Sequence, residues 1–326
     1  MLRTAAGVNG YAADVPGRDR LGEVVATLAG ILGGAAEQRG DRLRVTLDGP
    51  DHDVLADRLR PALAGLPVDV ETAPAHAAAP PADLRVAIRT APVPGAGPAA
   101  DADVVVEWRD RTWPVLRDVA PGLPYGERER RRETQAFFGI RAPAWDARFG
   151  DDGPAYAAAV RDAGVPPGGV VADVGCGTGR ALPALREAVG PGGTVLGIDV
   201  TPEMLEVARE RAAASDAALV LADAERLPLA DATLDALLAA GLIGHLADPV
   251  AGLAELARVT RPGGVIAAFH PVGRAVLAAR QGRTLRPDDT LAEPRLTSLF
   301  AASGWRAVHY EDDAARFLAL AVRAGG

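Results

Sequence analysis

Cysteine and lysine are scarce in this sequence of 326 residues, which contains one cysteine, Cys176, and no lysine. A single cysteine cannot form an intrachain disulfide or a multi-cysteine metal site, so we expect no bound metal. Long apolar runs are also missing, since none approaches the ~20 residues that cross a bilayer. Residues 1–15 lack the continuous apolar core of a secretory signal. We therefore expect a cytoplasmic protein without a membrane partner.

Positive charge is in the minority. The 35 cationic side chains, all arginine, face 43 acidic ones, and the formal net charge is -8. Binding to a nucleic-acid backbone requires several cations on one face. The densest basic cluster, residues 127–132, reads ERERRR and mixes both signs, as a solvated helix face does. We expect small-molecule partners and no nucleic acid.

The length leaves room for two domains of ordinary size, and residues 1–124 predict a small α/β domain. Its expected elements are helices over 18–39 and 51–66 and strands over 43–49, 68–72, 84–90 and 103–108. Stretches rich in proline and alanine predict loops over 75–83 and 91–103. We expect this domain to be non-catalytic.

Residues 125–326 show a different pattern, in which strands alternate with helices after a first polar helix. Such alternation predicts a doubly wound, mostly parallel sheet, here of seven strands. The last two strands, expected over 305–312 and 315–323, are joined by too few residues for a crossover. They should therefore pair as an antiparallel hairpin at one edge.

A glycine-rich turn joins a buried strand to a helix in the segment VVADVGCGTGR. Gly175 allows a tight turn, Gly177 lets the backbone approach a ligand, and Gly179 lets the helix begin against the strand. Alternatively, all three are turn glycines without a ligand. Cys176 lies inside the turn, where a small side chain fits and where packing is a better interpretation than nucleophilic chemistry.

Three acids follow the ends of successive strands. Asp173 lies two residues before the first glycine, Asp199 ends the next strand, and Asp223 follows the third. An acid at the second strand end can accept both ribose hydroxyls, and Asp223 can accept from an adenine amino group. Asp199 and Asp223 are alternatively helix caps or loop acids. Because both occur at consecutive strand ends, we favour an adenosine site.

With these motifs the sequence resembles the class I S-adenosylmethionine-dependent methyltransferases, especially the ubiquinone/menaquinone-methyltransferase-like group, over about residues 134–323. The segments VADVGCGTGR, GIDVTPEMLEVARERA, LADAERLPL and LAELARVTRPGG follow one another as in that family. The resemblance implies a Rossmann-like fold, S-adenosyl-L-methionine as cofactor and methyl transfer to a small molecule. The turn also lacks the wider G-x-G-x-x-G spacing of nicotinamide-binding proteins.

The resemblance also implies the cofactor contacts. Asp173 and the three glycines would line the methionine part, and Asp199 would hold the ribose. The remaining implied contacts are Cys176, Val200, Met204, Asp223, Ala224 and Ala240, with Val200 and Met204 on the adenine and Asp223 and Ala224 at its edge. Met204 is equally well interpreted as helix core.

Two histidines are candidate general bases for the acceptor, because His245 follows the fourth strand of the second domain and His270 ends the fifth. Both should face the cleft at the carboxyl edge of the sheet. Alternatively, His245 braces the helix that begins near Asp248 and His270 is structural; the family has no fixed base at either position. Arg274 either meets an anionic acceptor or is an exposed arginine.

The segment FFGIRAPAWDARFG is similar to the N-terminal lid of related enzymes and brings together Phe137, Phe138, Trp145 and Phe149. These aromatics suggest a shared apolar surface. Residues 271–294 form an insertion that we expect to shape the acceptor pocket. Other chemistry on the same cofactor, such as a cyclisation, and a non-enzymatic binding or scaffold role are the alternatives to methyl transfer.

The segment VTLDGPDHDVLADRLRPAL in the N-terminal domain resembles the start of a uridine-kinase-like phosphate-binding unit. Such a loop ends in glycine, lysine and a hydroxyl residue, which contact phosphate and magnesium. Counted from Gly49, those positions hold Val54, Leu55 and Ala56. We therefore expect a remnant used for packing or for a homodimer, or an ordinary small α/β unit.

Overall fold

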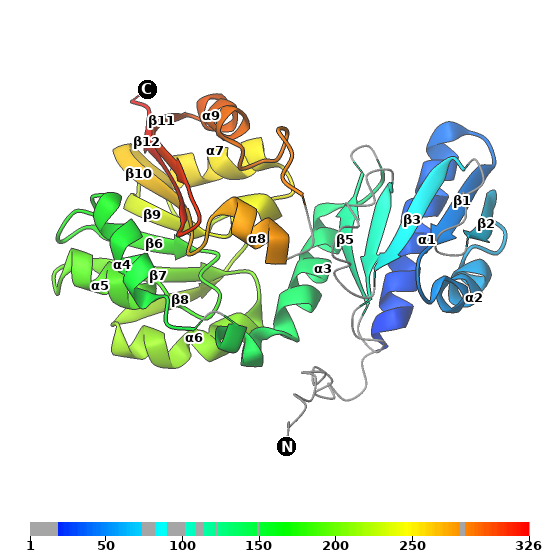
Figure 1. Cartoon of the computed structure of the whole chain (residues 1–326), viewed down its shortest axis with the longest axis horizontal. Coiled ribbons are helices and arrows are strands. Elements are labelled where there is room, and N and C mark those ends of the chain that lie inside the picture. The colour runs from blue at the N-terminus through cyan, green and yellow to red at the C-terminus, as the bar shows by residue number, and fades with distance from the viewer. Residues whose placement is uncertain are drawn as a thin grey trace, which may run out of the picture. The chain divides into compact units, whose positions relative to one another are not determined.

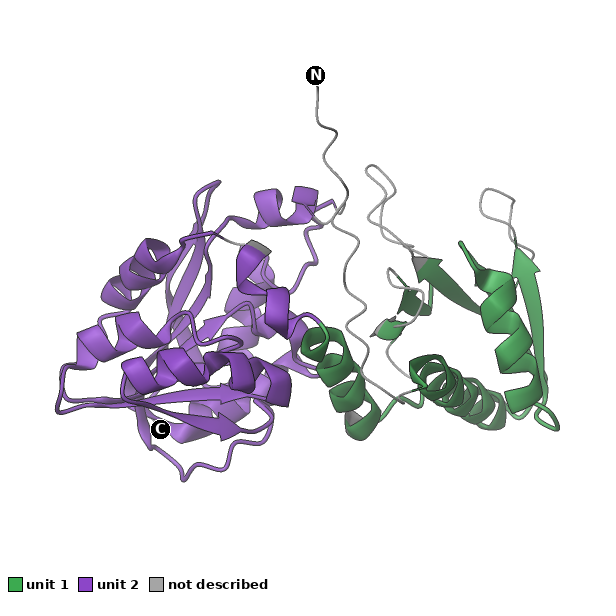
Figure 2. Cartoon of the chain, turned by 90° about the horizontal axis from the view of Figure 1, so that it is seen from below, with its two compact units in different colours: residues 1–140 green, residues 141–326 purple. Residues whose placement is uncertain are grey.

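The computed structural model of the chain describes residues 19–73, 82–89, 102–108, 114–120, 123–148, 150–280 and 284–325. It separates into two compact units, residues 1–140 and 141–326 (Figure 2). Most of the loops expected over 75–83 and 91–103, together with Phe149, lies outside the described residues. Within the described ranges, every helix is too short or too polar to cross a membrane.

Unit 1 is built on a five-stranded sheet in the order β2-β1-β3-β4-β5 (Figure 1). Its elements are α1 (Arg20–Arg39), β1 (Leu43–Asp48), α2 (His52–Ala62), β2 (Val68–Ala73), β3 (Leu84–Arg89), β4 (Val104–Glu107), β5 (Val115–Val119) and α3 (Glu127–Gly139). The first four strands are parallel, and β5 is antiparallel to β4. The sequence pattern does not predict β5, because VLRDV is too short to show a distinct period.

A buried ion pair attaches α3 to the rest of unit 1. Arg20 of α1 contacts Glu133 of α3, and both side chains are almost fully buried. Glu133 also accepts from the backbone N–H of Leu116 at 2.7 Å, and Arg20 Nε donates to the carbonyl of Pro114 at 2.9 Å. Charges are buried at tolerable cost only when they are paired and hydrogen-bonded. The helix that the sequence pattern groups with the second domain therefore packs with unit 1.

Unit 2 contains a seven-stranded sheet in the order β11-β12-β10-β9-β6-β7-β8. Its strands are β6 (Val170–Val174), β7 (Thr194–Asp199), β8 (Ala217–Leu221), β9 (Leu234–Ala240), β10 (Thr260–His270), β11 (Trp305–Asp312) and β12 (Phe317–Arg323). The strands from β10 to β8 are parallel, whereas β12 is antiparallel to both β10 and β11. The predicted α/β, Rossmann-like fold with a C-terminal antiparallel hairpin is confirmed.

Helices cover both faces of this sheet. They are α4 (Gly153–Asp162), α5 (Leu182–Val189), α6 (Pro202–Ala214), α7 (Pro249–Val259), α8 (Arg274–Arg280) and α9 (Glu293–Ala302), with short 3-10 helices η1 (Ala142–Ala144), η2 (Asp146–Arg148) and η3 (Ile243–His245). Alternate side chains of β9 enter two apolar cores, as the period of a strand requires: Leu237 joins the core under α7 and α9, and Leu238 joins the core under α4 and α5. The carboxyl ends of the parallel strands are therefore positioned from both sides.

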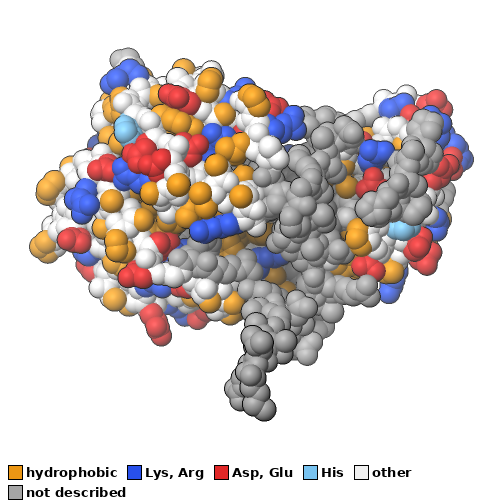
Figure 3. Space-filling model, in the orientation of Figure 1, with side chains coloured by type: hydrophobic (Ala, Val, Ile, Leu, Met, Phe, Trp, Pro, Cys, Tyr) orange, Lys and Arg blue, Asp and Glu red, His pale blue; other side chains and the backbone are white. Residues whose placement is uncertain are grey.

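Charges of both signs are mixed on the face of the molecule drawn in Figure 3. Arginines and acidic residues are scattered among hydrophobic side chains on the described part of unit 2. Many pair locally, for example Arg316 with Glu311 at 2.7 Å and with Asp162 at 2.6 Å. The Arg316 and Glu311 side chains are half-buried, whereas fully exposed pairs contribute little to stability, about 0–1 kcal/mol each.

Candidate functional site

The glycine turn closes against the end of β7. The backbone N–H groups of Gly175 and Cys176 both donate to the carbonyl of Ile198, at 2.8 and 2.9 Å. Gly179 has a φ of 78°, and a Cβ there would lie 2.9 Å from Leu182. A side chain at Gly179 would therefore strain the backbone, and the Leu182 side chain would have to move to make room for it.

Asp199 at the end of β7 ties the turn to the next helix. Its Oδ2 accepts from the Gly177 N–H and its Oδ1 from the Thr201 N–H, both at 2.8 Å. Burial raises the pKa of this carboxyl, and the backbone N–H groups oppose that rise. Since each carboxylate oxygen offers two acceptor sites, both oxygens can still accept from a ligand.

Asp173 lies on β6 beside Asp199 and is 2% exposed. Its Oδ1 has no hydrogen-bond partner among the described residues. Burial, followed by the neighbouring charge of Asp199, raises its pKa to about 8. A buried acid in this state favours either a proton or a cationic group beside it.

Met204 and Val200 lie where β7 leads into α6. Met204 is 1% exposed, and its sulfur lies 4.0 Å from the place where a Cβ of Gly177 would be. Met204 therefore packs beneath the glycine turn as helix core, while Val200 is half-buried at the surface of the site. Cys176 is buried, and burial raises the pKa of its thiol, as suits a packing residue.

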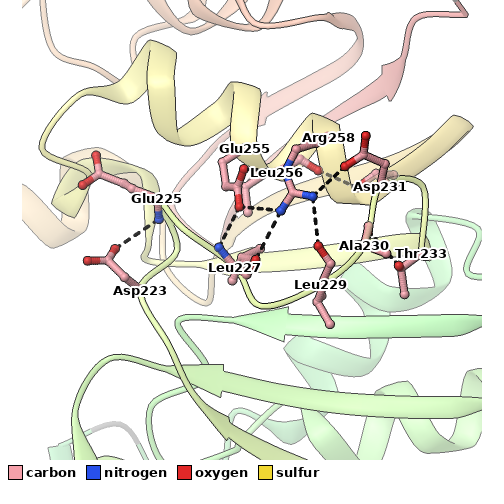
Figure 4. Close-up of polar contacts among 11 residues, drawn as sticks. Asp223, Glu225, Leu227, Leu229, Ala230, Asp231, Thr233, Glu255, Leu256 and Arg258 are labelled. Carbon is pink, nitrogen blue, oxygen red and sulfur yellow. Dashed lines mark hydrogen bonds and ion pairs between the residues drawn. The ribbon is translucent and has the colours of Figure 1, made fainter.

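The connection from β8 to β9 carries Asp223 and Ala224. Asp223 Oδ1 accepts from the Glu225 N–H at 3.1 Å (Figure 4). Ala224 is buried and packs in the core of unit 2. Sequence reasoning missed two residues of α7, Glu255 and Arg258, that hold this connection in place. Their only signal was membership of the segment LAELARVTRPGG.

His270 and Ala240 end neighbouring strands. Ala240 pairs with Phe269 and is half-buried. His270 Nδ1 lies 3.0 Å from the Val272 carbonyl and 3.2 Å from the Val272 nitrogen, so this ring atom is engaged in the turn after β10. Burial lowers the pKa of His270, as do Arg180 and Arg280, while the contact with Val272 opposes the shift. The imidazole is therefore neutral at pH 7.

His245 lies in η3 and is exposed. Its backbone N–H donates to the carbonyl of Leu242 at 2.8 Å, which forms the short helix. The α7 N-terminus is capped by Asp248, whose Oδ1 accepts from the Val250 and Ala251 N–H groups at 2.9 and 3.0 Å. The cap of α7 is thus the side chain of Asp248, and the alternative that His245 braces this helix stays a prediction.

A cluster beside His270 was not foreseen. Tyr156 of α4 contacts Phe269 edge-to-face, with ring centroids 5.1 Å apart, and the Arg180 guanidinium lies 5.5 Å from the Tyr156 ring centroid. Arg180 also forms an ion pair with Asp152. Arg180 directly follows Gly179, and its position at the end of the glycine turn was the one signal available.

The segment expected as a lid contacts the turn through a polar side chain. Asp146 of η2 accepts from Thr178 Oγ1 at 2.5 Å and from Arg211 at 2.7 Å. Of the four aromatics, Phe137 and Phe138 belong to unit 1 and contact each other edge-to-face, with centroids 4.9 Å apart.

Arg274 is not an exposed arginine, because its side chain is only 12% exposed. It contacts the Tyr310 hydroxyl at 3.1 Å, Asp312 at 3.4 Å and Asp289 at 3.5 Å. Two carboxylates already balance its charge. Arg274 therefore ties the insertion over 271–294 to β11.

Comparison with known proteins gives a match within unit 2. Residues 172–268 match a family model described as a methyltransferase domain. A malonyl-(acyl-carrier protein) O-methyltransferase of Serratia marcescens is 46% identical over 92 residues, and a demethylmenaquinone methyltransferase of Staphylococcus aureus is 40% identical over 92 residues. Each alignment covers 28% of this chain, and 34% and 38% of those relatives. The chain thus spans about a third of the length of these curated relatives.

A similar solved structure is also known. An S-adenosylmethionine-dependent methyltransferase from Aquifex aeolicus is 25% identical, with a TM-score of 0.45, and the superposition covers 52% of this chain and 89% of that chain.

Proposed function

We propose that unit 2 is an S-adenosylmethionine-dependent methyltransferase that acts on a small-molecule acceptor. The match of residues 172–268 to a methyltransferase domain carries this proposal. The matched range includes the glycine turn and the ends of β6, β7, β8 and β9, and most of β10. In open α/β sheets, ligands bind at this carboxyl edge.

The buried acids fit this cofactor. Asp173 and Asp199 lie on neighbouring strands with little access to water, and Asp173 Oδ1 has no partner among the described residues. S-adenosylmethionine carries a sulfonium and an ammonium group, and a cation beside two buried carboxylates offsets their mutual repulsion. When bound, the cofactor supplies an electrophilic methyl group.

The side chains of the site then bind and orient the cofactor. Asp173 and the glycine turn would hold the methionine part, Asp199 would accept from the ribose, and Asp223 with Ala224 would border the adenine. Val200 would pack on the adenine, Met204 supports the glycine turn, and Ala240 would be a further contact of the cofactor. Methyl transfer from a sulfonium is an in-line displacement, so alignment and exclusion of water are the main tasks of the chain.

His270 is the candidate base on the acceptor side. It is neutral at pH 7 because burial and two arginines lower its pKa, and a neutral imidazole can take a proton from a hydroxyl or amine. His245 is the second candidate, and its exposed position in η3 suits it less well to a water-excluded step.

The test of the proposal is binding followed by product formation. Calorimetry on the full chain should give saturable binding of S-adenosylmethionine and of S-adenosylhomocysteine. An acceptor screen should then yield S-adenosylhomocysteine in proportion to methylated product. Binding without S-adenosylhomocysteine would favour other chemistry on the same cofactor, and no binding of either compound would refute the proposal.

For unit 1 we propose a non-catalytic role in packing or in a cytoplasmic homodimer. Leu55 and Ala56 are fully buried in its core, where they cannot act as phosphate ligands. Gly49 has a φ of 104°, and a Cβ there would lie 2.2 Å from the Ile88 carbonyl. The close approach of β3 therefore explains why a glycine is needed here, and a phosphate ligand is not required to explain it.

A further inference from the structure

Residues 222–233, called here the adenine-side loop, connect β8 to β9 and carry Asp223 and Ala224. Apart from an isolated bridge between Asp223 and Arg226, the loop contains turns and bends but no helix or strand. A segment without a hydrogen-bonded ladder of its own keeps one shape only through contacts with its surroundings. In this loop several of those contacts come from α7.

Arg258 of α7 donates hydrogen bonds from all three nitrogens of its guanidinium, to the adenine-side loop and to Glu255. Nη1 donates to the Leu229 carbonyl at 2.9 Å and to Asp231 at 2.7 Å. Nη2 donates to the Leu227 carbonyl at 3.2 Å, and Nη2 and Nε each donate to Glu255 at 2.7 Å (Figure 4). All five N–H donors of the guanidinium therefore have acceptors. Lysine, a point charge with three donors, cannot reproduce this arrangement.

Glu255 completes the attachment. Besides its two bonds from Arg258, it accepts from the Leu227 N–H at 2.7 Å. The pair on α7 thus holds both the N–H and the carbonyl of Leu227, whose side chain is 5% exposed in the core. A second tie runs from the Asp248 N–H to Glu225 at 2.9 Å.

The end of the loop is held in a conformation that it would not adopt alone. Ala232 has a φ of 52°, in the left-handed region that a non-glycine residue rarely adopts. Its N–H donates to the carbonyl of Arg258 at 2.9 Å. Strain of this kind persists only where the surroundings determine the backbone. Here the C-terminal end of α7 holds the backbone of Ala232 in this conformation.

We propose that Arg258 and Glu255 are positioning residues for base recognition, which fix the adenine-side loop so that Asp223 selects a base bearing a 6-amino group. This inference rests on the proposed function. Asp223 lies at the loop's start, with its carboxylate oriented by the Glu225 N–H. Recognition by one directional hydrogen bond requires placement within about 0.5 Å, which an unanchored loop does not provide.

The test compares two probes on the full chain: S-adenosylhomocysteine, and S-inosylhomocysteine, in which a carbonyl replaces the amino group. The wild type should bind the adenosyl probe about 10- to 100-fold more tightly, since a carboxylate facing a carbonyl is left unpaired. In Arg258→Met this ratio should fall at least about fivefold, mainly by weaker binding of the adenosyl probe. Glu255→Gln, a milder change that keeps an oxygen for Leu227, should lower the ratio in the same direction and to a smaller extent.

Arg186 of α5 offers a matched control. It donates to the carbonyls of Gly190 at 2.8 Å, Gly193 at 3.0 Å, Ser215 at 2.8 Å and Asp216 at 2.6 Å. It therefore braces loops as Arg258 does, but before β7 and β8, at the opposite ends of the strands. Arg186→Met should lower the melting temperature and leave the ratio of the two affinities unchanged.

Each outcome has a distinct meaning. An unchanged ratio in folded Arg258→Met, or in Glu255→Gln if the first variant does not fold, would reduce the pair to a structural role. An equal fall in Arg186→Met would also overturn the inference, because loss of stability alone would then explain it. A wild type that binds both probes equally would contradict base selection by Asp223. Failure of the wild type to bind either probe would instead refute the proposed function.

Discussion

Asp173 and Asp199 show how two acids of the same type differ once they are placed. Asp199 satisfies both oxygens on backbone N–H groups, whereas Asp173 keeps an oxygen without a partner among the described residues. Burial raises the pKa of both, because a charged carboxylate loses its hydration in the interior. Asp199 is thus a fixed part of the turn, and Asp173 is the acid whose charge a ligand can change.

Cofactor affinity should depend on pH through Asp173. Below its pKa of about 8, compared with an ordinary value of 3.8, the free protein holds a proton that a cationic ligand must displace. The affinity ratio of wild type to Asp173→Asn should therefore rise toward tenfold per pH unit between pH 6 and 8 and then level off. Calorimetry of S-adenosylmethionine on both proteins measures this ratio, and taking a ratio cancels the titration of the ligand. A constant ratio from pH 6 to 9 would exclude the linkage.

The same proton affects stability. The folded chain retains it up to about pH 8, and the unfolded carboxyl releases it near 3.8. Between these values the native state binds more protons, so the contribution of Asp173 to the free energy of unfolding falls as pH rises.

Replacement of Asp199 by alanine should weaken binding of S-adenosylmethionine by roughly 1.5–3 kcal/mol, the scale of a hydrogen bond to a charged group. Part of this loss of binding free energy is the hydrogen bond to the ribose. The other part is the weaker placement of the turn, because Asp199 also accepts from the Gly177 and Thr201 backbone N–H groups. Calorimetry on the folded variant is the measurement, and Asp162→Ala at an exposed surface pair is the control. Unchanged affinity in Asp199→Ala would remove this residue from the site.

His270→Ala separates chemistry from binding. If the acceptor is a hydroxyl or an amine, turnover should fall roughly 10²- to 10⁴-fold, the usual contribution of a general base. Cofactor affinity should stay nearly intact, because the Nδ1 contact is with its own turn at Val272. Turnover and affinity are measured on the same variant. Equal losses in both would mean that His270 supports the fold instead.

At the scale of elements, η1 and η2 lie against the glycine turn and α6. Asp146 connects two of these parts, since it accepts from Thr178 in the turn and from Arg211 in α6. Arg211 also donates to the Thr178 carbonyl at 2.8 Å, which closes a three-residue polar link. The segment expected as an aromatic lid is thus attached to the glycine turn and α6 through the polar side chain of Asp146, which the aromatic residues did not predict.

Asp146→Ala should loosen this attachment. Hydrogen exchange at the amides of residues 175–179 should become faster, because the turn loses one of its external ties. Dissociation of S-adenosylhomocysteine should become roughly 5- to 10-fold faster, the effect of about 1–1.4 kcal/mol. Hydrogen exchange read by mass spectrometry measures the first rate, and stopped-flow dissociation of S-adenosylhomocysteine measures the second. If both rates match those of the wild type, the link has no influence on the turn.

At the scale of the whole molecule, each unit has an apolar core of its own. Unit 1 includes α3 through the buried pair of Arg20 and Glu133, so a fragment that ends at residue 125 would lack part of its fold. Experiments on unit 1 are therefore best made on the full chain.

The full chain should not bind ATP with magnesium through unit 1. Val54, Leu55 and Ala56 supply neither the ammonium nor the hydroxyl that contacts phosphate and metal in a phosphate-binding loop. Calorimetry with ATP and magnesium, in the presence of saturating S-adenosylhomocysteine to block unit 2, should give no heat of binding. Saturable, magnesium-dependent binding would show that the unit retains phosphate chemistry by another route.

The sequence alone was sufficient for features that depend on neighbours along the chain. Alternating strands and helices gave the parallel sheet and its final hairpin, and the spacing of Gly175, Asp199 and Asp223 identified one sheet edge. These patterns are local because strand period, turn geometry and the meeting of parallel strand ends follow from short-range sterics and topology.

Only the tertiary structure decided which side chains become partners across long separations. Arg258 and Arg274 are alike in sequence, yet one contacts loop residues 27 to 31 positions earlier and the other contacts a strand 36 to 38 positions later. The same holds for Glu133, which reaches Arg20 and so groups α3 with unit 1. Burial and pairing depend on the packed arrangement of all elements, and no local spacing encodes them.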